Sequence, residues 1–398
     1  MRVLLVTEEH EPRGGGLTTA VQQLARHVAG AGDETTILCT GREPLAAPDG
    51  ARLIQCEPSA LGRRWGWNSR LFPTIKAHLA GRGVDLVHVH GVWQAAHWYA
   101  ARRARAEGIP LVFSAHGMLE PYHWSDRGRG QLLMKRTYWA LLAYPVLRHA
   151  NVIHAITPNE ARNLRRLFPT GTVHLIPNAV DLEEIDRDLL EVGWAGGFAR
   201  EPTIAFLGRF HPKKGLDILI DAFSQAELPP SWRLKIAGPP GVPEYMARVE
   251  TALSRSAKRD RIDLVGPIFG SDKWRFLRTA GVLAVPSLSE AIGLVNLEAA
   301  ACGTPSITTR ATGLEDWEDG GGILVSPEVG ALRAGLERVS RLSPQEYAER
   351  SRASRALVER RYSWGVIGNR WRDVYARARA NGTGPAGRSG QPSGSIES

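Results

Sequence analysis

The chain has 398 residues, enough for two or three domains, and 43% of them are hydrophobic and 23% charged, as in ordinary globular proteins. The net charge of +9 permits an anionic partner, but no helix-turn-helix, zinc or RNA-binding signature accompanies it, so we expect no nucleic acid. Three distant cysteines and the lack of a long apolar run argue against a disulfide framework, a zinc ribbon and a membrane span, which favours a cytoplasmic protein.

Residues 1–195 are predicted to form a first domain in which strands and helices alternate. The predicted strands are apolar runs at residues 3–6, 36–39, 52–56, 86–90, 111–114, 152–156 and 173–176. Continuous apolar runs are typical of parallel strands covered on both faces, and their alternation with helical patterns indicates βαβ units. An acidic helix near 182–190 and a glycine-rich stretch at 193–197 place the domain boundary just before residue 200.

Residues 200–358 repeat this pattern and predict a second domain. Its predicted strands lie at residues 203–207, 234–237, 262–265, 282–285, 306–308 and 323–325. A helix at 359–380 is expected to pack back on the first domain, and the Gly-, Ser- and Pro-rich residues 381–398 are expected to be a disordered tail. The fold class is therefore α/β, with two doubly wound parallel sheets that face a cleft.

A triple glycine, Gly14 to Gly16, follows the first strand and opens a helix. Glycine lets a backbone approach a ligand closely, and the N–H groups at a helix N-terminus attract anions. The spacing fits neither the dinucleotide fingerprint nor the Walker A motif. A phosphate or sugar contact through Gly15 and Gly16 and a plain flexible turn therefore both stay open.

Two histidines follow neighbouring predicted strands of the first domain. His90 ends the strand at 86–90, His116 follows the strand at 111–114, and a glycine comes after each. Ligands of open α/β sheets bind beyond the carboxyl ends of the strands. We expect His116 in the active site, whereas for His90 a structural role is the more frequent outcome.

Charged residues follow two predicted strands of the second domain. Arg209 and Lys214 come after the strand at 203–207, and two cations at a strand end suit a diphosphate, although a solvated basic loop is a serious alternative. Glu290 follows the strand at 282–285, and Glu298 lies in the next helix. Their carboxylates can accept hydrogen bonds from sugar hydroxyls. A favourable interaction with the helix dipole would explain Glu298 but not Glu290.

The segment from Glu290 to Glu298 has the pattern Glu-x7-Glu and continues as Ala-Ala-Ala-Cys-Gly-Thr-Pro. It resembles the signature of retaining glycosyltransferases of family 4, or group 1. These enzymes have the GT-B fold of two Rossmann-like domains around a cleft. The Gly-Arg-x4-Lys-Gly stretch at 208–215 resembles their diphosphate-binding motif. Further matches follow in the family's order at residues 14–16, 114–117 and 176–181.

The resemblance implies that the second domain binds a nucleotide-sugar donor. Arg209 and Lys214 would neutralise its diphosphate, Glu298 would bind its ribose, and Glu290 would contact the hydroxyls of the transferred sugar. The backbone around Ile268 would cradle the base.

Backbone amides and the first domain would complete the site. The resemblance implies that the amides of Gly293, Leu294 and Val295 face phosphate and sugar, and that Gly15 and Gly16 approach the phosphate from the other domain. His116 would lie near the anomeric carbon and the acceptor. The sequence departs from the family at Ala291-Ile292, where an aromatic residue or glycine is usual, and at Asn178-Ala179, where Asn-Gly is usual.

The expected reaction moves a sugar from a UDP- or GDP-sugar to a hydroxyl of a glycan or lipid-linked acceptor, with retention of configuration and without a metal, in the synthesis of lipopolysaccharide or another polysaccharide. A metal-using alternative needs a D-x-D motif at a strand end. Asp186-Arg187-Asp188 has the right letters but lies in the predicted acidic helix, so we interpret it as a solvated helical face.

The basic charge is concentrated in residues 1–180, which carry 21 basic and 13 acidic side chains. Basic residues stand beside Trp and Leu at 63–67 and 127–148, a pattern that suits an anionic membrane surface. Packing of these apolar side chains in the core is an equally good explanation.

Two other functions are weighed against transfer: a non-catalytic nucleotide-sugar-binding protein and a GT-B-fold sugar-nucleotide epimerase. The four charged residues Arg209, Lys214, Glu290 and Glu298 argue against the first, and the Glu-x7-Glu context argues against the second. The sequence leaves open the sugar, the base, the acceptor and the oligomeric state.

Overall fold

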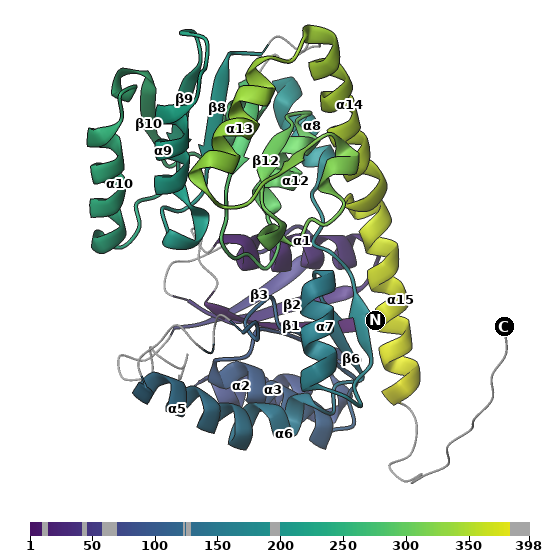
Figure 1. The fold of residues 1–398 in the computed structure, drawn as a ribbon. Coiled ribbons are helices and arrows are strands. Elements are labelled where there is room, and N and C mark those ends of the chain that lie inside the picture. The colour runs from purple at the N-terminus through teal and green to yellow at the C-terminus, as the bar shows by residue number, and fades with distance from the viewer. Residues whose placement is uncertain are drawn as a thin grey trace, which may run out of the picture.

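The computed structural model describes residues 1–9, 15–41, 46–57, 70–121, 124, 129–191 and 200–382. Two parallel sheets stack one above the other, and two successive helices at the C-terminal end descend along one side, one beside each sheet (Figure 1). The stretches singled out above at 63–67 and 193–197, as well as Gly14 and residues 383–398, lie outside the described residues.

The first sheet has seven strands in the order β3-β2-β1-β4-β5-β6-β7, all paired in parallel. The strands are β1 (Arg2–Glu9), β2 (Glu34–Thr40), β3 (Ala51–Cys56), β4 (Leu86–His90), β5 (Leu111–Ser114), β6 (Val152–Ala155) and β7 (Val173–Leu175). The helices are α1 (Gly15–Gly30), α2 (Leu71–Leu79), α3 (Ala95–Ala106), α5 (Arg129–Tyr138), α6 (Tyr144–Leu147) and α7 (Pro158–Leu167), with a 3₁₀ turn at Ala80–Arg82 and a π-helical turn at Trp139–Ala143.

The second sheet has six strands in the order β10-β9-β8-β11-β12-β13, again all parallel. The strands are β8 (Thr203–Leu207), β9 (Arg233–Ala237), β10 (Ile262–Gly266), β11 (Val282–Val285), β12 (Ser306–Thr308) and β13 (Ile323–Leu324). The helices are α9 (Leu216–Gln225), α10 (Pro243–Arg255), α11 (Gly270–Thr279), α12 (Leu294–Ala301), α13 (Val329–Ser340) and α14 (Pro344–Arg361), with 3₁₀ turns at Pro212–Lys214, Arg259–Arg261, Arg310–Thr312 and Trp317–Gly320. Every predicted strand is confirmed, because a parallel sheet covered on both faces needs uninterrupted apolar runs.

The predicted helix at 359–380 is wrong in its start and end. The chain leaves α14 at Arg361, and α15 runs from Trp364 to Gly382, so the helix also includes two residues assigned to the tail. At the break, Val180 forms an isolated parallel bridge with Ser363. This bridge connects the segment that leads from the first domain to the second with the segment that leads back to the first.

The returning helix α15 covers one face of the first sheet and contacts α1, β4 and β5 (Figure 1). Its buried Ile367, Trp371 and Tyr375 share a core with side chains of β1 and α1. Helices α2, α3, α5, α6 and α7 cover the opposite face. One of the two layers that cover the first sheet is therefore formed by α1 together with a helix from the C-terminal end of the described chain.

A line of hydrogen bonds crosses this core from α15. Tyr375 contacts His88 (O–Nδ1 2.9 Å), His88 contacts Ser114 (Nε2–Oγ 2.7 Å), Ser114 contacts His154 (Oγ–Nδ1 2.7 Å), and His154 contacts the carbonyl oxygen of Ile176 (2.7 Å). A carbonyl only accepts, so His154 must donate to it from Nε2. Burial lowers the pKa of both His88 and His154, which favours neutral imidazoles. With neutral rings, Ser114 donates to His154, His88 donates to Ser114, and Tyr375 donates to His88.

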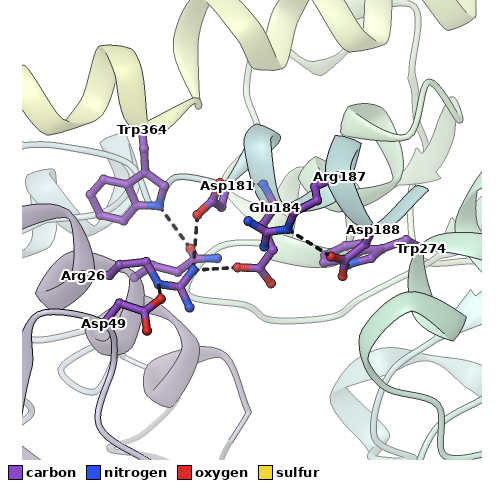
Figure 2. A network of polar contacts seen from close by, with 9 residues as sticks. Arg26, Asp49, Asp181, Glu184, Arg187, Asp188, Trp274 and Trp364 are labelled. Carbon is purple, nitrogen blue, oxygen red and sulfur yellow. Dashed lines mark hydrogen bonds and ion pairs between the residues drawn. The ribbon is translucent and has the colours of Figure 1, made fainter. Parts of the chain in front are cut away.

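Helix α8 (Leu182–Glu191) lies beside the second sheet, although it precedes that sheet in the chain (Figure 1). Its Ile185 and Leu189 pack into the core of the second sheet. On its other side, Arg26 of α1 donates to Glu184 (2.7 Å) and to Asp181 (3.3 Å). Figure 2 shows this contact, with Arg26 also beside Asp49. The helix predicted as the end of the first domain thus belongs by packing to the second core.

Asp186 and Asp188 of α8 are both engaged in packing contacts. Asp186 binds Arg355 of α14 (2.7 Å), and Asp188 accepts a hydrogen bond from the indole of Trp274 (3.1 Å; Figure 2). The prediction of a helix at this D-x-D sequence is confirmed, but its aspartates bind neighbouring elements and do not form a merely solvated face. Among the described residues no group of three His, Cys, Asp or Glu side chains is placed to hold a metal ion.

Candidate active site

The loop after β8 presents two cations. The exposed Arg209 guanidinium makes no hydrogen bond or ion pair with any residue that the structure describes. Lys214 ends a 3₁₀ turn and folds back, so that its Cε lies 3.8 Å from the place that a Cβ on Gly208 would take. The two cations thus leave the same strand end, and one of them has no partner within the described part of the chain.

Glu290 lies in the loop after β11, and β11 is the neighbour of β8 in the sheet. Its Oε1 accepts from the Lys214 ammonium and from the Ser287 hydroxyl (2.8 Å). Its backbone N–H donates to Ala311 after β12 (3.1 Å). Adjacent parallel strands therefore bring together Lys214 and Glu290, and sequence reasoning overlooked Ser287 as the group that orients the carboxylate.

The N-terminus of α12 has fewer free amides than predicted. The Gly293 N–H donates to Thr312 (3.0 Å) and the Leu294 N–H to Ile292 (2.9 Å). Val295 lies in the first turn, where N–H groups have no acceptor within the helix. Of the three predicted amides, Val295 is the one best placed to meet an anion.

Glu298 forms an ion pair that the sequence did not indicate. Its Oε1 lies 2.6 Å from Nζ of Lys273 on α11, and both side chains are at least three-quarters buried. Lys273 also lies 4.3 Å from the centre of the Trp274 ring. Ile268 lies two residues before α11 begins at Gly270 and is half-buried against the core of the second domain. No spacing rule links Lys273 to Glu298, because the pair depends on how α11 packs beside α12.

We expect Glu298→Ala to weaken the binding of UDP or GDP by about 10–100-fold, the range expected when a charged hydrogen bond is lost. Lys273→Ala should have a smaller effect, because Lys273 acts through the carboxylate. Isothermal calorimetry measures both, with Glu318→Ala, an exposed carboxylate of a nearby turn, as the control. Unchanged affinity in Glu298→Ala would remove the ribose assignment.

On the side of the first domain, His116 adopts a left-handed backbone conformation with φ 52°. Its Nε2 lies 2.9 Å from Nδ1 of His90, and burial lowers the pKa of His116 to about 3. His90 is 2% exposed, and burial lowers its pKa as well. His116 is therefore neutral at physiological pH, and His90 is its hydrogen-bonding partner.

The two domains touch at the predicted motifs. Gly16 of α1 lies against Leu294, whose Cδ1 would be 3.4 Å from a Cβ on that glycine. A Cβ on Gly117 would lie 2.9 Å from the Cβ of Ala291, directly beside Glu290. The structure thus brings Gly16 and the His116 turn to loops of the second domain. Gly15 begins α1 on the same side.

Of the stretch at 127–148 the structure describes residues 129–148, which have both buried and exposed apolar side chains. Trp139 and Tyr144 pack against the core, whereas Leu133, Leu141 and Leu142 are 67%, 70% and 40% exposed. None of the helices in the described ranges has the length and apolarity of a bilayer span.

Models of known families match both halves of the chain. The model of glycosyltransferase family 4 matches residues 14–184, and the model of glycosyl transferases group 1 matches residues 201–341. A D-inositol 3-phosphate glycosyltransferase of Saccharomonospora viridis is 30% identical over 319 residues, which are 76% of this chain and 72% of that protein.

Two further likenesses extend over nearly the whole chain. An alpha-maltose-1-phosphate synthase of Mycolicibacterium smegmatis is 25% identical over 405 residues, covering 96% of this chain and all of that protein. The solved sucrose-phosphate synthase of Thermosynechococcus elongatus has a TM-score of 0.73 at 23% identity and covers 96% of this chain and 100% of its own. This likeness in structure confirms the predicted arrangement of two Rossmann-like domains.

Proposed function

This chain belongs to glycosyltransferase family 4, and we propose that it moves a sugar from a UDP- or GDP-sugar to an acceptor hydroxyl with retention of the anomeric configuration and without a metal cofactor. It is a glycosyltransferase of the GT-B fold that uses a nucleotide-sugar donor. The observation that carries the proposal is that Arg209, which pairs with none of the described residues, follows the same strand as Lys214, which pairs with Glu290.

Cleavage of the donor's glycosidic bond leaves negative charge on the diphosphate. Arg209, Lys214 and the Val295 amide are positioned to meet that charge, and fixed donors of this kind stabilise a transition state more than mobile water does. In the absence of a donor, Glu290 neutralises Lys214. We expect the diphosphate to compete for Lys214 and to leave Glu290 free to accept hydrogen bonds from the sugar.

Glu290 acts as a positioning group and not as a nucleophile in this proposal. When Lys214 turns to the diphosphate, the Ser287 hydroxyl still donates to Oε1 of Glu290 and orients the carboxylate toward the hydroxyls of the sugar. His116, kept neutral by burial, would form a hydrogen bond to the sugar or the acceptor without adding a positive charge. The leaving phosphate would take the acceptor proton on the same face.

Two acceptor classes have support from different observations. The names of the two relatives, D-inositol 3-phosphate glycosyltransferase and alpha-maltose-1-phosphate synthase, point to a small phosphorylated polyol or sugar. The exposed leucines of α5 and the π-helical turn favour a lipid-linked acceptor, as in polysaccharide or lipopolysaccharide synthesis at the cytoplasmic face of a membrane.

The lipid-linked alternative makes a direct prediction. Leu133 and Leu141 stand beside the exposed Arg136, so the double variant L133E/L141E should lose most of its binding to vesicles that contain anionic lipid. Co-sedimentation measures the bound fraction. The control is L190E, which alters a 66% exposed leucine on α8. Equal loss in the control, or no binding of the unaltered chain, would leave the phosphorylated acceptor as the proposal.

The proposed reaction is tested with labelled donors. A thermal-shift screen of nucleotide sugars first identifies the donor, because a ligand that binds the folded state raises its stability. The identified donor is then incubated with phosphorylated polyols, phosphorylated sugars or lipid acceptors. Product with retained configuration by NMR, formed equally in the presence of EDTA, is the expected result. Binding without transfer would favour a sensor, and conversion of the donor alone would favour an epimerase.

A further inference from the structure

Glu160 is a buried carboxylate that none of the predicted motifs includes. It lies in the first turn of α7 and is 2% exposed. Its Oε1 accepts the backbone N–H of Gly117 (2.6 Å), and its Oε2 accepts the backbone N–H of Ile156 (2.7 Å). Each oxygen therefore holds a different loop, one after β5 and one after β6.

These two loops are places where the first domain meets the donor-binding domain. Gly117 lies against Ala291, the residue after Glu290. Thr157, next to Ile156, lies against Gly313, where a Cβ would be 2.3 Å from the Thr157 Cγ2. One carboxylate thus holds two contact points between the domains.

The arrangement costs stability. Burial raises the pKa of Glu160 to about 7. The two backbone amides favour the charged form and oppose this shift, whereas the half-buried Glu120 adds to it. No cation is among them. Burying a carboxylate without a cation is unfavourable, and the N-terminus of α7 offsets only part of that cost. Glu160 also binds its own helix cap, because its N–H donates to the Thr157 hydroxyl (3.2 Å).

We propose that Glu160 is a positioning residue that holds the His116–Gly117 turn and the Ile156–Thr157 turn in register with the loop that carries Glu290. It touches neither donor nor acceptor. The inference rests on the proposed function, since the site that it aligns is the glycosyl-transfer site. A residue needed only for folding would show no preference for catalysis over donor binding.

The variant Glu160→Gln tests this role because it keeps the size and removes one acceptor. An amide oxygen can accept from one loop, but the amide NH₂ must then face the N–H of the other. We expect kcat to fall by about 10–100-fold, as for a small misplacement of reacting groups. The affinity for UDP or GDP by calorimetry should stay within about twofold, because apart from the contact at Gly16 the proposed donor ligands lie on the other domain.

Asn151→Ala is the matched control, because Asn151 also uses a side-chain oxygen to accept a backbone N–H of a neighbouring segment. Its Oδ1 accepts the N–H of Leu111 (2.9 Å) at the opposite end of β5, away from the site. This variant should lower the melting temperature and leave kcat unchanged. If Glu160→Gln does not fold, Glu160→Asp keeps the charge at shorter reach, and a lower kcat at unchanged donor affinity is still expected.

Hydrogen exchange provides a readout that is independent of turnover. In Glu160→Gln the segments 111–121 and 286–294 should exchange faster than in Asn151→Ala, even if no transfer reaction is found. That outcome would keep the positioning role and reject the proposed function. Unchanged kcat together with unchanged exchange in these segments, or an equal loss of kcat and donor affinity, would overturn the inference.

Discussion

Arg209→Ala is expected to lower kcat by about 10²–10³-fold, the usual effect of removing one fixed donor from a site where negative charge develops. The guanidinium is exposed and binds no described residue, so its removal takes nothing from the fold. Surface changes of this kind usually alter the free energy of unfolding by less than about 0.5 kcal/mol. A steady-state assay with the identified donor, together with a thermal melt, separates the two effects.

Two further variants sharpen this prediction. Arg209→Lys keeps the charge but loses the planar fork, so its kcat should lie between that of the unaltered chain and that of Arg209→Ala. Arg352→Ala removes an exposed arginine from α14 in the same domain and should behave like the unaltered chain. Near-normal turnover in purified Arg209→Ala would reject the diphosphate role.

The effect of Arg209 and its neighbours depends on the order of the strands. Lys214 and Glu290 are 76 residues apart, yet they form an ion pair because β8 and β11 are adjacent in the sheet. The sequence could predict this meeting in outline, since polar residues at the carboxyl ends of parallel strands share one edge. It could not predict that two amides at the start of α12 already have acceptors.

The residues that sequence reasoning missed depend on packing between helices and strands far apart. Lys273 reaches Glu298 from a neighbouring helix, and Glu160 reaches Gly117 from 43 residues away. Tyr375 reaches His88 across 287 residues. None of these side chains stands in a motif, and each becomes visible only when the two elements are placed side by side. Strand runs, by contrast, carry their signal locally, which is why the sheets were predictable.

Acidification from pH 6.5 to 5 is expected to destabilise the chain strongly because of its buried neutral histidines. Burial lowers the pKa of His97 and His154 to about 4 and that of His116 to about 3. Below pH 6.5 the unfolded chain binds protons that the folded chain excludes, so each of the three costs about 1.4 kcal/mol per pH unit, or about 2 kcal/mol down to pH 5. Glu160 acts oppositely, since its raised pKa of about 7 gives the folded state an extra proton. His88 and His90, also lowered by burial, add to the loss.

The net loss of about 4 kcal/mol or more is a large part of the 5–15 kcal/mol that domains usually have. Urea unfolding at pH 6.5 and 5.0 measures it as a fall in the midpoint. His97→Asn removes one titrating group while its side chain can still accept the Gln94 N–H, as His97 Nδ1 does at 3.3 Å, so its pH dependence should be shallower by one proton. His149→Asn changes an exposed histidine whose pKa is also lowered by burial and nearby arginines, but less than that of His97, so it should change the slope less than His97→Asn does. A midpoint that stays constant, or equal slopes in both variants, would contradict the lowering of these histidine pKa values by burial.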